Sequence, residues 1–170
     1  MPGLEELEVR ENKLVSTAEL QALPQLTHVS LGVNQLTALR GLADKAHLQS
    51  LEAENNCIGE LAAADLRGCT RLERLVLYRN RLADVGEGLR RATRLTHLDL
   101  GRNRLVAATG LESCTRLETL ILYENAMEEV ELPHTPLLRQ LFLNGNRLRT
   151  PPRLALLPML QVESCGRVAT

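Results

Sequence analysis

The segment LTHLDLGRNRL, residues 95–105, decides the fold of this chain. Its apolar residues and its asparagine follow the pattern L-x-x-L-x-L-x-x-N-x-L. The L-x-L alternation is typical of a short strand that turns one face inward. The same pattern begins seven times, at Leu4, Leu26, Leu48, Leu72, Leu95, Leu117 and Leu138. The starts are 22, 22, 24, 23, 22 and 21 residues apart, so the sequence predicts an array of stacked repeats.

Every copy of the pattern contains an asparagine and, two residues later, an apolar side chain. The asparagines are Asn12, Asn34, Asn56, Asn80, Asn103, Asn125 and Asn146. The apolar residues after them are Leu14, Leu36, Ile58, Leu82, Leu105, Met127 and Leu148. Each asparagine stands where the chain leaves the strand and turns. We therefore predict a structural role for all seven, in which the amide satisfies backbone groups of its own turn and of the next turn.

The remainder of each unit must return along the side opposite the strands, which themselves stack about 4.8 Å apart. The predicted fold is an α/β solenoid: a horseshoe with a parallel concave sheet of about seven short strands and helical or 3-10 turns on the convex side. Segments 61–66 and 85–89 are examples of such returns. We expect a single domain over residues 1–170, with a partial unit from about residue 160.

The charge balance of the chain argues against partners that are bound by bulk electrostatics. The formal net charge is −1 and the pI is about 6.4, which does not favour direct nucleic-acid binding or attraction to anionic membranes. The sequence has no apolar run long enough to span a membrane, and its N-terminus has neither a basic start nor an apolar stretch. We expect a soluble, unsecreted, cytoplasmic protein, with the nucleus or a cilium or flagellum as alternatives.

The four cysteines, Cys57, Cys69, Cys114 and Cys165, are not clustered. Cys69 and Cys114 occupy equivalent places two units apart, which predicts a separation of about 10 Å, too long for a disulfide. We expect the thiols to be reduced and mostly buried.

Over residues 4 to about 150, the pattern resembles the 22-residue class of leucine-rich repeats found in eukaryotic intracellular proteins. The junctions Leu23-Pro24-x-Leu26 and Leu157-Pro158-x-Leu160 are also similar to that class. Its members include a nuclear regulatory subunit of protein phosphatase-one, an axonemal dynein light chain, the spliceosomal A-prime protein and acidic nuclear phosphoproteins. These proteins share a scaffold rather than one function, so the resemblance implies a non-enzymatic binding module and does not choose the partner.

The sequence departs from complete members of that class at both ends. Leu4 opens the first repeat with no capping helix before it, and the unit near Leu160 stops after Gln161-Val162-Glu163 without its asparagine. Terminal repeats of a solenoid need a polar cap, because their apolar faces have no neighbour. We expect either a partner that covers these ends or a chain that is a fragment of a longer protein.

Side chains that alternate with the inner leucines point out of the concave sheet. All three aromatic residues of the chain, Tyr78, Tyr123 and Phe142, lie in these positions. With Val76 and Ile121 they predict an exposed apolar patch, which is typical of an interaction site. Tyr78 and Tyr123 lie two strands apart in one row with a glycine between them, which predicts a slot about one side chain wide.

Charge is divided along the same face. The first half carries Glu6, Glu8, Glu11, Glu52 and Glu54 against Arg10 alone, whereas Arg74, Arg79 and Arg102 lie in the middle. The partner should therefore offer an apolar anchor near one end and basic groups near the other. The residues predicted to contact it are Arg74, Val76, Tyr78, Arg79, His97, Asp99, Arg102, Ile121, Tyr123, Phe142, Glu52 and Glu54. The alternative is that the charges only solvate an open sheet and the aromatics reflect β-propensity.

No constellation in the sequence favours catalysis or a metal. His28 and His97 share a row but should lie roughly 14 Å apart, too far to bind one ion. His97 and Asp99 resemble an oriented base, yet no serine or cysteine is placed as a nucleophile. Glu52 and Glu54 could be taken for paired catalytic carboxylates, but an open, wet face does not provide the environment that such a pair needs. We expect no catalytic residues, no metal and no cofactor. The sequence has no C-x-x-C motif, no glycine-rich phosphate loop and no interleaving of basic and aromatic residues, so zinc, nucleotide and direct nucleic-acid binding all lack support.

Two functions remain open from the sequence. The first is a scaffold or regulatory subunit, monomeric alone, that binds a folded domain or helix on its concave face. The second is a structural segment that completes a larger repeat assembly, cytoskeletal or axonemal, through its uncapped ends. The second predicts end-to-end association whatever happens to the aromatic residues.

Overall fold

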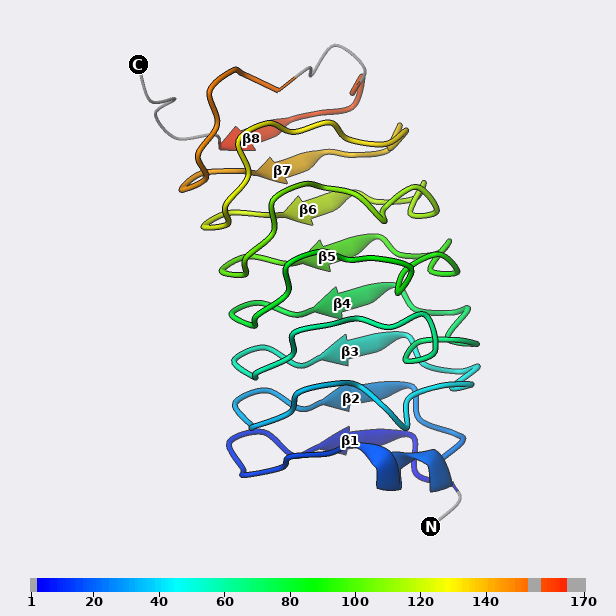
Figure 1. Ribbon diagram of the computed structural model, residues 1–170. Helices are drawn as coiled ribbons and strands as arrows, with labels where there is room; N and C mark the ends of the chain where they lie inside the picture. The colour runs from blue at the N-terminus through cyan, green and yellow to red at the C-terminus, as the bar shows by residue number, and fades with distance from the viewer. Residues whose placement is uncertain (1–2, 153–156, 165–170) are drawn as a thin grey trace.

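Eight short strands form one parallel sheet in the computed structural model, which describes residues 3–152 and 157–164. They are β1 (Glu6–Glu8), β2 (His28–Ser30), β3 (Ser50–Glu52), β4 (Arg74–Val76), β5 (His97–Asp99), β6 (Thr119–Ile121), β7 (Gln140–Phe142) and β8 (Val162–Ser164). Each strand pairs with the next one along the chain, and Figure 1 shows them stacked in that order with all arrows pointing the same way. The solenoid prediction is confirmed, and the partial unit adds an eighth strand to the seven that the pattern located.

Equivalent positions of successive units lie directly opposite each other. His28 pairs with Ser50, Arg74 with His97, and Gln140 with Val162. The register is therefore unaffected by the variation in repeat length. The extra residues of the longer units lie in the return segments, where they do not disturb the sheet.

The return segments are tight turns rather than long helices. A 3-10 helix, η1 (Ala18–Ala22), lies in the first unit, and no other helix occurs in residues 3–152 and 157–164. Elsewhere the chain uses single backbone bonds of the 3-10 type, such as Ala92 N–H to the Leu89 carbonyl at 2.9 Å and Cys114 N–H to Leu111 at 2.9 Å. These bonds keep each return within one layer of the stack.

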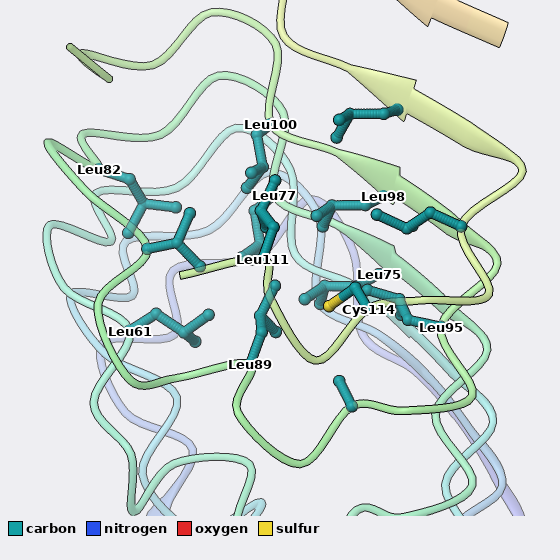
Figure 2. Close-up of a cluster of buried hydrophobic side chains, with 14 of the residues drawn as sticks. Leu61, Leu75, Leu77, Leu82, Leu89, Leu95, Leu98, Leu100, Leu111 and Cys114 are labelled. Carbon is teal, nitrogen blue, oxygen red and sulfur yellow. The ribbon is translucent and has the colours of Figure 1, made fainter. Parts of the chain in front are cut away.

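Leucines from the strands and from the returns meet in one continuous core. Figure 2 shows Leu75 and Leu98 of the sheet facing Leu89 and Leu111 of the returns, and all four are fully buried. Because burying one such side chain is worth roughly 1.5–3 kcal/mol, the stacked leucines supply most of the apolar stabilisation of a chain with few aromatics.

The cysteines of the described residues are free thiols, as predicted. Cys69 and Cys114 are buried and Cys57 is half-buried, whereas Cys165 lies outside the described residues. Burial raises the pKa of Cys69 to about 11 and that of Cys114 to about 12. Both are therefore unreactive packing residues at neutral pH.

The repeated asparagines join adjacent units, and Asn80 is a representative case. Its Nδ2 donates to the Leu77 carbonyl of its own turn at 3.0 Å and to the Ala53 carbonyl of the preceding unit at 2.9 Å. Its Oδ1 accepts the Ile58 N–H, also of the preceding unit, at 3.0 Å. The same bonds are made by Asn34, Asn56, Asn103, Asn125 and Asn146.

The neighbour that each asparagine contacts is the preceding turn, not the next one as the sequence suggested. The reason is that the amide projects back toward the strand end of the unit before it. Asn12, which has no preceding unit in this chain, is exposed and donates only to Val9 and Arg10 of its own turn.

A left-handed residue precedes every one of these asparagines. The residues are Glu11, Val33, Asn55, Arg79, Arg102, Glu124 and Gly145, with φ between 51° and 72°. This conformation reverses the chain after the strand so that the asparagine side chain points inward. It is unfavourable for L-residues, and most of all for a β-branched one such as Val33 at φ 56°.

We predict that Asn80→Ala lowers the free energy of unfolding by about 3 kcal/mol, because it leaves the Ile58 N–H and the Ala53 and Leu77 carbonyls without their partner. Asn12→Ala is the matched control and should cost about 1 kcal/mol or less, because water reaches its turn. Urea denaturation of both variants measures the difference. Equal losses would contradict the role of the bonds between units.

Replacing Val33 should stabilise the fold. We predict that Val33→Asn raises the free energy of unfolding by about 1 kcal/mol, because asparagine tolerates the left-handed conformation. Thr37→Asn is an exposed control outside the set of positive-φ residues, and it should change stability little. Thermal melts compare the melting temperatures of the two variants with that of the unmodified chain. An unchanged or lower melting temperature for Val33→Asn contradicts the prediction.

Candidate functional site

The alternate side chains of strands β1 to β7 form one continuous solvent-facing surface, called the sheet face below. Ser50 and Glu52 of β3 are half-buried on this surface, whereas Leu51 between them is fully buried in the core. The same alternation occurs in β5 and β6. The sheet face is therefore the surface that the sequence analysis placed on the concave side.

Arginines pair with two of the five glutamates in the acidic half of the sheet face. Arg10 forms ion pairs with Glu52, at 3.4 Å, and with Glu54, while Arg74 Nε lies 3.2 Å from Glu52 Oε1. Glu54 reaches Arg10 across Gly32, where a Cβ atom would collide with its carboxylate. Glu54 is only 8% exposed, so it is not available to a partner in the way the sequence suggested.

The predicted slot between the two tyrosines is absent, because their rings fill it. The ring centroids of Tyr78 and Tyr123 are 6.0 Å apart, with an angle of 40° between the planes. A Cβ atom at Gly101 would lie 2.9 Å from Tyr123 Cε1. Glycine at this position thus lets the Tyr123 ring lean toward Tyr78, and the contact between the two rings stabilises that orientation.

Arg102 completes the cluster beside the tyrosines. Its Cζ lies 5.9 Å from the centroid of the Tyr78 ring, and its Nε lies 2.8 Å from Glu124 Oε2. The guanidinium is therefore held between a carboxylate and an aromatic ring, a favourable position for a cation. Glu124 was not among the predicted contact residues, although its place beside Arg102 in the repeat register could have identified it.

The apolar patch is smaller than predicted. Val76 is only 8% exposed, so it belongs to the covered surface and not to the patch. Ile121 and Phe142 are half-buried, as are the two tyrosines, and Arg79 is exposed. We call Tyr78, Arg102, Ile121, Tyr123 and Phe142 the aromatic cluster.

His97 and Asp99 occupy alternate positions of β5 on the sheet face, and both are half-buried. Burial, reinforced by Arg74, lowers the pKa of His97. Burial raises the pKa of Asp99, and the Gly101 N–H, which donates to Asp99 Oδ1 at 2.9 Å, opposes that shift. Asp99 therefore fixes the backbone after its own strand. Within the described part of the chain, no three His, Cys, Asp or Glu side chains gather as a metal site would require.

Solved structures of other proteins have the same architecture as this chain. It superimposes on an internalin (inlF) of Listeria monocytogenes with a TM-score of 0.81 and 25% identity, over 95% of this chain and 48% of that chain. It superimposes on an LRR protein of Leptospira interrogans with a TM-score of 0.74 and 22% identity, over 99% of this chain and 51% of that chain. The chain folds as a leucine-rich-repeat solenoid. An internalin C2 of Listeria monocytogenes matches it in the same way, with a TM-score of 0.78 and 22% identity over 96% of this chain and 71% of that chain.

The chain is also similar to a curated protein. It is 31% identical over 106 residues to the protein phosphatase 1 regulatory inhibitor subunit PPP1R7 homolog of Arabidopsis thaliana. The match covers 62% of this chain, and the chain spans 31% of the length of that relative. No protein-family model matches the chain. None of the helices in the described residues has the length and apolar character needed to cross a membrane.

The contact between Tyr78 and Tyr123 should change the pH at which Tyr123 ionises, and titration measures this. Burial, followed by the adjacent Tyr78 phenol, raises the pKa of Tyr123 to about 12. The stability that comes from the neutral phenol is therefore complete below its ordinary pKa of about 10 and is lost as the pH rises from there to about 12. We predict that Tyr78→Phe moves the pKa of Tyr123 back toward 10.

Absorbance at 295 nm against pH measures this shift, because the chain has only 2 tyrosines and no tryptophan. Phe142→Leu is the control and should leave the titration curve unchanged. If Tyr123 already ionises near pH 10 in the unmodified chain, the ring contact does not have the described effect.

Proposed function

We propose that this chain is a non-enzymatic protein-interaction module, a scaffold or regulatory subunit that binds a folded domain or a helix of another protein through its sheet face. The aromatic cluster is the observation that carries the proposal. Tyrosine and arginine are the residue types that contribute most to protein interfaces, and here they stand on a rigid sheet facing solvent. The cluster lies on the open face of a sheet, where a folded partner can contact several adjacent strands at once.

The chemistry of the proposed partner follows from the charges that remain unpaired. It offers an apolar or aromatic anchor to the aromatic cluster and basic groups toward Glu6, Glu8 and Glu11, which are exposed. Glu52 and Glu54 contribute less to the attraction of basic groups than Glu6, Glu8 and Glu11, because they already form ion pairs with Arg10 and Arg74. Arg79 is exposed in the middle of the sheet face, where it can pair with an acidic group of the partner.

The curated relative supports a regulatory role. Its name describes a regulatory inhibitor subunit of protein phosphatase 1, and the match extends over 106 residues, 62% of this chain. We therefore propose that the chain acts by binding a protein and not by catalysis, as one domain located in the cytoplasm. The relative is much longer, so its partner is not carried over to this chain.

A second function is favoured by the first unit. Leu4 and Leu7 are half-buried there, whereas the equivalent Leu26 and Val29 of the second unit are buried. The β1 end of the solenoid thus exposes apolar surface that another repeat would cover. In this alternative, the chain is a segment of a larger repeat assembly and associates end to end.

Affinity capture from a cell lysate, followed by titration of the captured partner, tests the first proposal. We predict that Tyr78→Ala/Tyr123→Ala/Phe142→Ala weakens binding of the partner at least about 30-fold, because interface aromatics contribute most of the binding energy. The control is Val106→Ala/Leu137→Ala/Met159→Ala, which removes three exposed apolar side chains that do not belong to the sheet face.

Circular dichroism melts establish that both triple variants remain folded. Loss of the partner with the first variant and retention with the control supports binding at the sheet face. If both variants retain the partner, the proposal is wrong. Sedimentation of the unmodified chain then tests the alternative, which requires self-association that the aromatic substitutions do not change.

A further inference from the structure

Three arginines lie at equivalent positions of successive units, directly before the first leucine of each. They are Arg71, Arg94 and Arg116, and the repeat register places them about 4.8 Å apart from one layer to the next. All three are exposed, and each follows an exposed threonine in a repeated Thr-Arg-Leu sequence. They lie where the chain enters β4, β5 and β6, at the side of the sheet face. We call them the arginine row.

The arginine row is not neutralised by the chain. Some arginines of the solenoid pair with an acidic residue of the adjacent unit, as in Arg67 with Asp44 at 2.9 Å and Arg149 with Glu128 at 3.0 Å. Other exposed arginines of the described residues, such as Arg81 and Arg104, form no ion pair. No ion pair within residues 3–152 and 157–164 involves a member of the arginine row. Like charges at equivalent positions of adjacent units repel each other, and a partner of opposite charge would relieve that repulsion.

The charge around the arginine row is strongly one-sided, although the net charge of the chain is near zero. Residues 67–116 contain eleven arginines and five acidic residues. Residues 1–66 contain four basic and ten acidic residues. The middle of the solenoid is therefore a basic zone bordered by an acidic one, and such a separation attracts and orients a charged partner.

We propose that the arginine row is a second binding surface, which receives an acidic α-helix of a partner protein lying along the stack of repeats. Carboxylates three or four residues apart on one helix face are about 5–6 Å from each other, close to the layer spacing of about 4.8 Å. One acidic helix can thus place a carboxylate against each arginine, and guanidinium groups bind carboxylates through paired hydrogen bonds. This surface is separate from the aromatic cluster, so the proposal does not depend on binding at the sheet face.

The surroundings favour an acidic protein segment over a nucleic acid. Glu73 and Glu118 lie two residues after Arg71 and Arg116, and both are exposed. Their carboxylates would repel a continuous phosphate backbone, whereas a helix presents discrete charges that can avoid them. The only two tyrosines lie on the sheet face, so the row also lacks the aromatic side chains on which bases stack.

Fluorescence anisotropy at low ionic strength tests the proposal with defined probes. The main probe is a labelled helical peptide of about 20 residues with glutamates three and four residues apart on one face. A peptide of the same composition with two central prolines is the non-helical probe, and a single-stranded oligonucleotide of about 20 nucleotides is the nucleic-acid probe. The variant is Arg71→Gln/Arg94→Gln/Arg116→Gln.

The matched control is Arg81→Gln/Arg104→Gln/Arg147→Gln, which removes the same charge from exposed arginines on the other side of the strands. We expect the unmodified chain to bind the helical peptide and the row variant to bind it about tenfold more weakly, with a change below about twofold in the control. Equal losses in both variants, or no binding by the unmodified chain, overturn the proposal. Equal binding of the proline-containing peptide, or tighter binding of the oligonucleotide that is lost in the row variant, also overturns it.

Discussion

The bonds between each asparagine amide and the turn before it are the constraint on which the rest of this structure depends. Where a strand ends and the chain reverses, backbone groups point into the solenoid and have no water to bind. Asn80 satisfies three of these groups, of which two belong to the preceding unit. The left-handed residue before it, Arg79 at φ 53°, turns the amide inward. Each unit is thus joined to its neighbour at one fixed point, and the strands pair without any shift of register.

Fixed register converts sequence repeats into rows of neighbouring side chains, and the function of the surface follows from what fills each row. In one row, Gly32 lies beside Glu54 and Gly101 beside Tyr123. The missing side chain lets each larger neighbour lean across a strand, toward Arg10 in one case and toward Tyr78 in the other. The glycines therefore determine which groups are paired within the chain and which still face solvent.

The sequence alone predicts the parts of this structure that repeat. Seven copies of one pattern locate the strands, the inward leucines and the asparagines, because these positions obey the same packing requirement in every unit. The sequence does not predict how a side chain tilts toward an adjacent repeat, because the tilt depends on the size of a neighbouring side chain some 22 residues away in the chain. For this reason the prediction of a slot between Tyr78 and Tyr123 was wrong. The sequence also did not predict that Val76 and Glu54 would be buried. The direction of each asparagine was missed as well, since the pattern is the same whether the amide points to the preceding unit or to the next.

The side chains that do not pack in the core are the ones that differ from one repeat to the next. The buried rows tolerate only leucine and its close equivalents, whereas the exposed rows hold glutamate in the first units, arginine in the middle and aromatics in the later ones. A stack of identical exposed charges gains nothing from folding and is retained at a cost in stability. Arg102 is paired with Glu124 within the chain, whereas Arg71, Arg94 and Arg116 are exposed and form no ion pair in the described residues. Where like charges recur in one row of adjacent units, the solenoid presents a surface that a partner of opposite charge can complement along several layers at once.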